Sequence, residues 1–204
     1  MLEKLEIIFQ MVVLAFTRFL DWLENLFQIK PQDQANVYSS IGKKQVDKGN
    51  FDEGIISLKK AIELNPADVE SHRKIGYAYF KKNLWDNAIE AYKKVLEHNS
   101  GDAAIYFQLG LAYSKKKTFN EAADSYKKSL ELSPKQPEAS YRLGLLYDQQ
   151  KMFDEAIVFY QKAIEYDSRN PKYYYSLGLT YDSKGMHDKA IEYLRKAMET
   201  EEAA

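Results

Sequence analysis

Glycine recurs at one fixed interval in this chain of 204 residues. The recurring positions are Gly42, Gly76, Gly110, Gly144 and Gly178, each 34 residues after the last. A fixed period of this length indicates one supersecondary unit repeated along the chain, with each copy burying its apolar face against its neighbours. Such an array offers a long curved surface and no single central pocket. The period therefore favours binding over catalysis.

The residues around each glycine recur at the same interval. When units are counted from Ala35, position 7 is Ile or Leu, position 20 is small and position 24 is large in every unit. The glycine at position 8 and the small residue at position 20 would let two antiparallel helices approach closely, and the large residues would fill the remaining space. We predict one helix at about positions 2–14 and a second at about positions 18–31. Gly49-Asn50, Asn83 and Gly185 fall between them and suit a tight turn.

The predicted units cover the chain from Ala35 onward. They are 35–68, 69–102, 103–136, 137–170 and 171–204. The common order of residues in a unit is leucine-glycine, then tyrosine, a small residue, a large residue and finally proline. This order resembles the pattern of the tetratricopeptide repeat (TPR) family. The resemblance implies an all-α fold: a right-handed solenoid of five tandem helix-turn-helix units behind a hydrophobic N-terminal helix. It also implies that the first helix of each unit lines the concave side.

In TPR proteins this concave side is a groove that binds peptides. Carried over by position, the resemblance implies a groove that is aromatic and apolar in its middle, basic in the early units and acidic in the late ones. The predicted groove residues are Arg73, Tyr77, Phe80, Lys81, Phe107, Leu111, Lys115, Tyr141, Leu145, Asp148, Tyr175, Leu179 and Asp182. Exposed aromatic rings are good anchors for a peptide or protein partner. The alternative interpretation is that some of these rings only pack between neighbouring helices.

One known TPR ligand is disfavoured by the first unit. TPR proteins that clamp the C-terminus of a chaperone carry Lys and Asn at early groove positions, where they bind the terminal carboxylate. Ser39 and Lys43 occupy those positions here. We therefore do not expect a chaperone clamp.

Residues 1–34 precede the repeats and are unusually apolar. Large apolar residues at alternating spacings of four and three predict a helix with a continuous apolar seam. The seam consists of Leu5, Phe9, Val12, Phe16, Phe19, Leu23 and Leu26. Something must cover this seam, because burying each large side chain is worth about 1.5–3 kcal/mol. The cover could be the first repeat, the groove of another copy, a partner protein or a lipid surface.

Two features help to decide what covers the apolar seam. The uncharged run from Ile7 to Thr17 would rise only about 16 Å as a helix, against a hydrocarbon core of roughly 30 Å, so we expect no membrane span. Helices that lie on membranes usually have a polar face rich in Lys and Arg, which this one lacks, and this favours a protein cover. Residues 1–34 equal one repeat length and are at best a degenerate repeat. We expect residues 19–29 to cap the array and residues 5–16 to drive self-association in another copy's groove.

Composition and motifs argue against several classes of function. Lys and Arg total 29 against 30 for Asp and Glu, so there is no basic excess of the kind that marks nucleic-acid binders. The chain has no cysteine, and its three histidines have no ligand spacing, so we predict no metal site. It also shows no nucleophile–base arrangement and no phosphate-binding loop. We expect a cytoplasmic protein that is not an enzyme and needs no cofactor; a regulatory module of a separate enzyme is the rival interpretation.

The whole chain resembles the magnetosome-associated TPR proteins of magnetotactic bacteria. The resemblance rests on Phe19-Leu20-Asp21, then Phe27-Gln28-Ile29, then Asn36-Val37-Tyr38 ahead of Gly42. It implies a protein that coats the magnetosome membrane peripherally and recruits magnetosome membrane proteins. The prediction is thus an interaction scaffold that forms homo-oligomers through its N-terminal helix and groove. The alternative is a TPR adaptor anchored to a membrane surface by that helix.

Overall fold

The computed structural model describes residues 30–203, and within this range it contains ten α-helices and no strand. The helices are α2 (Pro31–Asp47), α3 (Phe51–Leu64), α4 (Val69–Lys81), α5 (Trp85–His98), α6 (Ala103–Lys116), α7 (Phe119–Leu132), α8 (Pro137–Gln149), α9 (Phe153–Tyr166), α10 (Pro171–Ser183) and α11 (His187–Glu202). The predicted N-terminal helix, with its seam from Leu5 to Leu26, lies outside the described residues.

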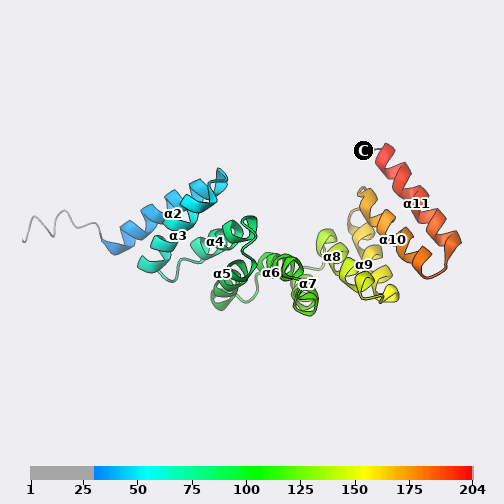
Figure 1. Ribbon diagram of the computed structural model, residues 1–204, viewed down its shortest axis with the longest axis horizontal. Coiled ribbons are helices and arrows are strands. Elements are labelled where there is room, and N and C mark those ends of the chain that lie inside the picture. The colour runs from blue at the N-terminus through cyan, green and yellow to red at the C-terminus, as the bar shows by residue number, and fades with distance from the viewer. Residues whose placement is uncertain (1–29, 204) are drawn as a thin grey trace, which may run out of the picture.

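The helices form five hairpins that follow one another along an arc, with α2 at one end and α11 at the other (Figure 1). Within each hairpin the two helices pack on each other, and the second helix also packs on the first helix of the next hairpin. No hairpin contacts all the others, so the core runs along the array as a series of linked clusters. The predicted all-α solenoid is confirmed.

The recurring glycines let the two helices of a hairpin approach closely. A Cβ atom added at Gly110 would lie 2.5 Å from Cε1 of Tyr126, and one added at Gly144 would lie 2.7 Å from Cε1 of Tyr160. Both tyrosines have an exposed fraction of 0%. Any side chain at these glycines would therefore collide with a ring that is packed on all sides. The prediction that position 8 must be glycine to allow the crossing is confirmed.

Local residue choices fix where the helices begin. Asp68 and Asp102 accept hydrogen bonds from the backbone N–H groups of Ser71 and Ile105, at 3.0 and 3.1 Å, and so cap α4 and α6. Proline occupies the first turn of α2, α8 and α10, where its missing N–H leaves no hydrogen bond unmade.

The first helix of every hairpin ends in the same way. At unit position 15 the backbone is left-handed in all five hairpins: Gly49 (φ 85°), Asn83 (60°), Lys117 (66°), Lys151 (60°) and Gly185 (75°). The N–H of the next residue then bonds back to a carbonyl five residues earlier, as from Met152 to Tyr147 at 2.9 Å. This is the hydrogen bond that closes a helix ending in a left-handed residue. It turns the chain at a fixed angle into the second helix.

Lysine is a poor residue for this conformation, because its Cβ crowds the backbone when φ is positive. We expect Lys151→Gly to raise the free energy of unfolding by about 0.5–1 kcal/mol, measured by urea denaturation. Lys135→Gly is the control, since Lys135 lies in a turn without a positive φ and should gain nothing. Equal effects of the two changes would contradict the prediction.

Candidate functional site

The candidate site is the groove, defined here as the surface formed by α2, α4, α6, α8 and α10. Three of the predicted groove residues are large apolar side chains exposed to solvent: Tyr77 is 39% exposed, Tyr175 54% and Leu179 43%. They come from α4 and α10, near the two ends of the array. Large apolar side chains left in water at several points along one surface are typical of a binding surface.

A pocket of about 410 Å³ lies in the early groove between α2, α4 and α6. It is lined by Val46, Asp47, Arg73, Lys74, Tyr77, Tyr92, Ala104, Ile105 and Gln108. The structure thus brings Arg73 and Tyr77, two of the predicted site residues, into one pocket. Tyr92 comes from α5 and reaches the pocket from behind the groove helices.

Tyr92 was not among the predicted site residues, yet it carries the most unusual polar group of this pocket. The residue is 1% exposed, and its hydroxyl has no hydrogen-bond partner among the described residues. Burial raises the pKa of Tyr92, the Tyr77 phenol raises it further, and Arg73 opposes both. The hydroxyl therefore stays protonated and lies within electrostatic reach of Arg73 and Tyr77. Its oxygen is shielded from solvent, so it would donate a hydrogen bond to a bound acceptor only when the ligand displaces the side chains around it.

Arg73 is less available than its sequence position suggests. Its guanidinium lies 2.6 Å from Oδ2 of Asp102 and 3.3 Å from Oε2 of Glu70. Burial alone would raise the pKa of Asp102, but the hydrogen bond and charge of Arg73, together with the backbone N–H groups of Ile105 and Ala104, outweigh it, and the pKa falls below its usual value. The same pairing raises the pKa of Arg73 against the effect of burial. The early groove is consequently less basic than the sequence predicts.

A second pocket, of about 640 Å³, lies at the late end of the groove between α10 and α11. It brings together Tyr141 and Tyr175, again two predicted residues. Tyr141 also packs inward: its ring centroid is 4.9 Å from that of Tyr173, and its hydroxyl is 3.2 Å from Oγ of Ser176. Within residues 30–203 Tyr175 has no such contacts, and at 54% exposed it is the freer of the two rings.

Several predicted rings and aliphatic residues take part in packing between helices. Phe107 lies 5.7 Å from Tyr126 between ring centroids, and Phe80 meets Trp85 edge-on at 5.1 Å. Leu111 and Leu145 are partly buried against the core clusters. For these four residues the structure favours the alternative interpretation, in which they support the groove more than they contact a ligand.

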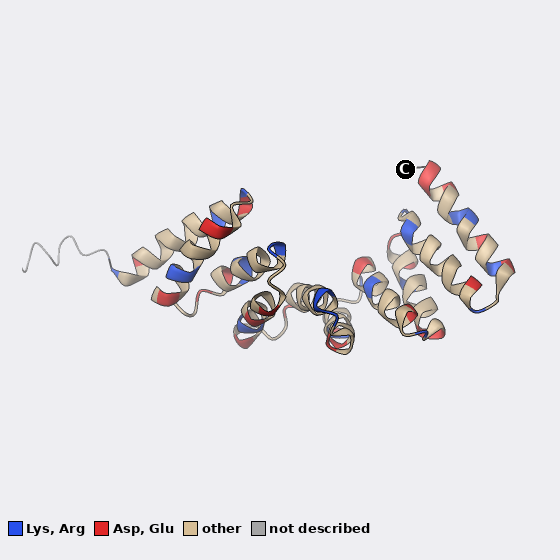
Figure 2. Ribbon diagram, viewed as in Figure 1, with Lys and Arg blue, Asp and Glu red and all other residues tan. Residues whose placement is uncertain are grey.

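The predicted charged residues have varied surroundings. The ammonium of Lys81 lies 5.3 Å from the ring centroid of Tyr77, and Lys115 is exposed. Asp148 accepts a hydrogen bond from Thr180 at 3.1 Å, and Asp182 lies 2.8 Å from Nδ1 of His187. Basic and acidic residues are interspersed along the ribbon in Figure 2, and both signs occur from one end of the array to the other.

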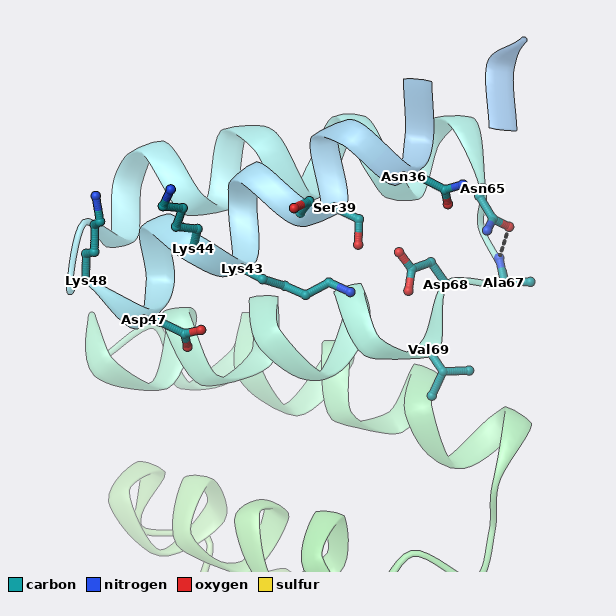
Figure 3. Close-up of a pocket in the computed structure, with 11 residues that line it drawn as sticks. Asn36, Ser39, Lys43, Lys44, Asp47, Lys48, Asn65, Ala67, Asp68 and Val69 are labelled. Carbon is teal, nitrogen blue, oxygen red and sulfur yellow. Dashed lines mark hydrogen bonds between the residues drawn. The ribbon is translucent and has the colours of Figure 1, made fainter. Parts of the chain in front are cut away.

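The first section of the groove is polar. A pocket of about 870 Å³ lies between α2 and the start of α4, and Lys43 extends across it toward Asp68 (Figure 3). Burial raises the pKa of Asp68, but hydrogen bonds from Ser71 and the charge of Lys43 lower it more. Oγ of Ser39 lies 2.8 Å from Oγ of Ser71 and is buried. The aromatic anchors thus begin at α4 and are absent from this section.

Within residues 30–203, no three His, Asp or Glu side chains come together as ligands for a metal ion. None of the helices in that range is both long enough and apolar enough to cross a bilayer.

Family models match almost all of the repeat region. The TPR repeat model matches residues 42–83, 76–117 and 115–151, and tetratricopeptide repeat models match residues 137–170 and 171–203. The comparison with curated protein sequences returns no match.

Solved structures of MamA are similar to the chain over most of its length. One MamA crystal structure is 35% identical, covers 83% of this chain and 93% of its own, and superposes with a TM-score of 0.80. MamA from Desulfovibrio magneticus RS-1 is 26% identical, with coverage of 84% and 97% and a TM-score of 0.79. YrrB, described as a TPR protein with an unusual peptide-binding site, shares the fold at 23% identity, 80% and 84% coverage and a TM-score of 0.72.

Proposed function

Because the chain belongs to the tetratricopeptide repeat family, as a MamA-like member, we propose that it is a non-enzymatic scaffold that binds further copies of itself and recruits partner proteins. Proteins of this family mediate interactions between proteins, which supports the scaffold role. The resemblance to magnetosome-associated TPR proteins supports a finer proposal. In that proposal the protein forms a peripheral coat on the cytoplasmic side of the magnetosome membrane.

The observation that carries the proposal is the set of unused binding groups in the groove. Tyr77, Tyr175 and Leu179 leave apolar surface in water, and the buried hydroxyl of Tyr92 has no partner in the part of the chain that the structure describes. Covering a large apolar side chain is worth about 1.5–3 kcal/mol, and a buried donor gains further when it meets an acceptor. Both needs are met by an apolar helix or strand that lies along the groove.

Residues 1–29 supply a segment of suitable chemistry. Their sequence repeats large apolar residues at helical spacing, with the seam defined above. We propose that this segment of one copy docks in the groove of another, with its apolar side chains against Tyr77 and Tyr175. Partner proteins that carry a similar apolar helix would bind in the same way.

Sedimentation velocity tests the role of residues 1–29. At equal concentration we expect the full chain to form large assemblies and residues 31–204 to sediment as a much smaller species. Tyr175→Ala in the full chain should weaken assembly about tenfold, because an exposed aromatic anchor is lost. Tyr166→Ala is the matched control, since Tyr166 is 37% exposed but lies on α9, outside the groove. If the shortened chain assembles like the full chain, docking by residues 1–29 is wrong.

The hydroxyl of Tyr92 allows a second test of the same docking. Tyr92→Phe should weaken binding of a peptide with the sequence of residues 1–29 by about fivefold to tenfold, since one hydrogen bond is lost. The fold should be unaffected, because the hydroxyl has no partner to lose among the described residues. Fluorescence anisotropy measures the affinity, and unchanged binding would exclude the hydroxyl as a contact.

A further inference from the structure

An ion pair recurs at the junctions between hairpins. Lys82 pairs with Asp52, Lys116 with Asp86 and Lys184 with Asp154. Each lysine stands at the end of a first helix (unit position 14), and each aspartate lies in the first turn of the preceding second helix (position 18), 30 residues earlier. At the remaining junction both positions are neutral: they hold Gln150 and Asn120. The two positions are therefore matched in charge at every junction of the array.

The two ends of the array each keep one half of this pair. Lys48 occupies position 14 of the first hairpin, and Asp188 occupies position 18 of the last. Both side chains are exposed, and within residues 30–203 neither forms an ion pair. Figure 3 shows Lys48 directed away from Asp68, and thus away from the next hairpin.

The outer face of α11 also keeps the apolar residues that join one hairpin to the next. Ile191 is 67% exposed, whereas Ile89 and Ile157 at the same unit position are 7% and 8% exposed. Met198 is 59% exposed, while its equivalents Ile62, Leu96, Leu130 and Ile164 are partly buried against the core. The last hairpin of a solenoid normally has a polar outer face. This one has the surface of an internal hairpin.

The outer face of α2 shows the complementary pattern. Val37 is 54% exposed, and Ile105 at the same position is 1% exposed. Ile41 is 44% exposed, and its equivalent Leu143 is 0% exposed. Lys44 stands where the other units have Ala78, Ala112, Leu146 and Thr180. Its aliphatic stem can lie over an apolar neighbour while the charge stays in water.

We propose that copies of this protein stack end to end, with α11 of one copy against α2 of the next, in the geometry that joins hairpins within the chain. Val37 and Ile41 would then cover Ile191 and Met198 of the neighbouring copy. Lys48 would pair with Asp188 of that copy, which restores the ion pair of the internal junctions. An interface between two different surfaces of one protein is heterologous, so it builds an open filament or a closed ring.

The charge pattern favours a second copy over the chain's own N-terminal segment as the partner of α2. The residue 30 positions before Lys48 is Arg18. A preceding segment in the repeat register would thus place two like charges where every internal junction has opposite or neutral ones. Stacking adds to the self-association proposed above and uses the ends of the array, where Met198 also borders the late groove pocket.

A charge swap in the full chain tests the stacking. We expect Lys48→Asp and Asp188→Lys each to weaken assembly about tenfold. The opposite charges of the unchanged protein raise the affinity a few-fold, and like charges would lower it by a similar factor. The double variant, and an equimolar mixture of the two single variants, should both recover the assembly of the unchanged protein in sedimentation velocity. Groove docking predicts no such recovery. Failure of both to recover assembly, or single variants without effect, would overturn the stacking.

The apolar part of the interface has its own test. Ile191→Arg should weaken assembly by about thirtyfold or more, because it buries a charge in the contact. Val158→Arg is the control: Val158 is 48% exposed but lies on α9, within the array. Equal effects of the two variants would overturn the stacking. If removal of residues 1–30 abolishes assembly while the end variants assemble normally, stacking is wrong and groove docking stands. If the chain without residues 1–30 still assembles while the end variants do not, groove docking is wrong and stacking stands.

Discussion

Replacing Tyr126 with alanine is expected to lower the free energy of unfolding by about 3–5 kcal/mol. The ring is 0% exposed and fills the space between α6 and α7. It packs against Gly110 and lies 5.7 Å from the ring of Phe107. Alanine would leave a cavity, because the helices around a deleted ring relax only partly into the space it leaves. Urea denaturation followed by circular dichroism measures the loss.

Tyr126→Phe separates the ring from its hydroxyl. The hydroxyl is buried without a hydrogen-bond partner among the described residues, and burial raises the pKa of Tyr126. Removing an unsatisfied buried group costs nothing, so we expect the phenylalanine variant to match the unchanged protein or to exceed its stability by up to about 1 kcal/mol. A loss of more than about 1 kcal/mol would show that this hydroxyl makes a hydrogen bond.

Gly110→Ala is expected to destabilise the protein by about 2 kcal/mol. The added Cβ would lie 2.5 Å from Cε1 and 2.6 Å from Cδ1 of Tyr126, far inside van der Waals contact. Alanine favours a helix over glycine by about 1 kcal/mol. The clash outweighs this gain, because the opposing ring is fully buried and cannot move without displacing its neighbours. Thermal and urea unfolding measure the net effect.

Gly101→Ala is the control for the glycine. Gly101 lies in an exposed turn, and its added Cβ would meet only Oδ1 of Asn99, at 3.6 Å. This change should stay within about 0.5 kcal/mol of the unchanged protein. In the double variant Gly110→Ala/Tyr126→Ala the cavity accepts the new methyl group. The loss of unfolding free energy in the double variant should therefore be smaller than the sum of the two single losses by about 1 kcal/mol or more. Strict additivity would contradict the proposed contact.

The sequence predicted the fold because the period of 34 residues reflects a local requirement. Each glycine at position 8 faces a large residue at position 24 of the same hairpin, as Gly76 faces Tyr92, and both lie within one short stretch of chain. A contact of this kind can be inferred from spacing alone. The helix ends were predictable for the same reason: α4 begins and ends one residue before the predicted positions, and its turn at Asn83 was expected.

The groove was harder to predict, because it depends on contacts between hairpins. Arg73 was predicted as a basic groove residue, but Asp102, 29 residues later, neutralises much of its charge. Phe107 and Tyr141 occupy the same unit position as Tyr175, yet their rings lie against neighbouring rings, and the ring of Tyr175 does not. Tyr175 lies in the last described hairpin, so no following hairpin packs on it, and its own hairpin has Leu194 where those of Phe107 and Tyr141 have Tyr126 and Tyr160.

One signal in the sequence could have been used further. The lysines at position 14 and the aspartates at position 18 recur with the period of the repeat, and their neutral counterparts Gln150 and Asn120 change together. Without the structure nothing shows that these two positions meet, since the lysine follows its aspartate by 30 residues. Once the pairs are seen, the unpaired Lys48 and Asp188 become informative.

The sequence by itself determined the repeated hairpin, its close helix crossing and its turns, because those depend on residues that are neighbours along the chain. Only the tertiary structure decided which groove side chains are exposed, which hydroxyls are buried without a partner among residues 30–203 and which apolar faces are exposed at the two ends of that array. These properties arise from how one hairpin stacks on the next, and stacking brings together residues that no local pattern connects.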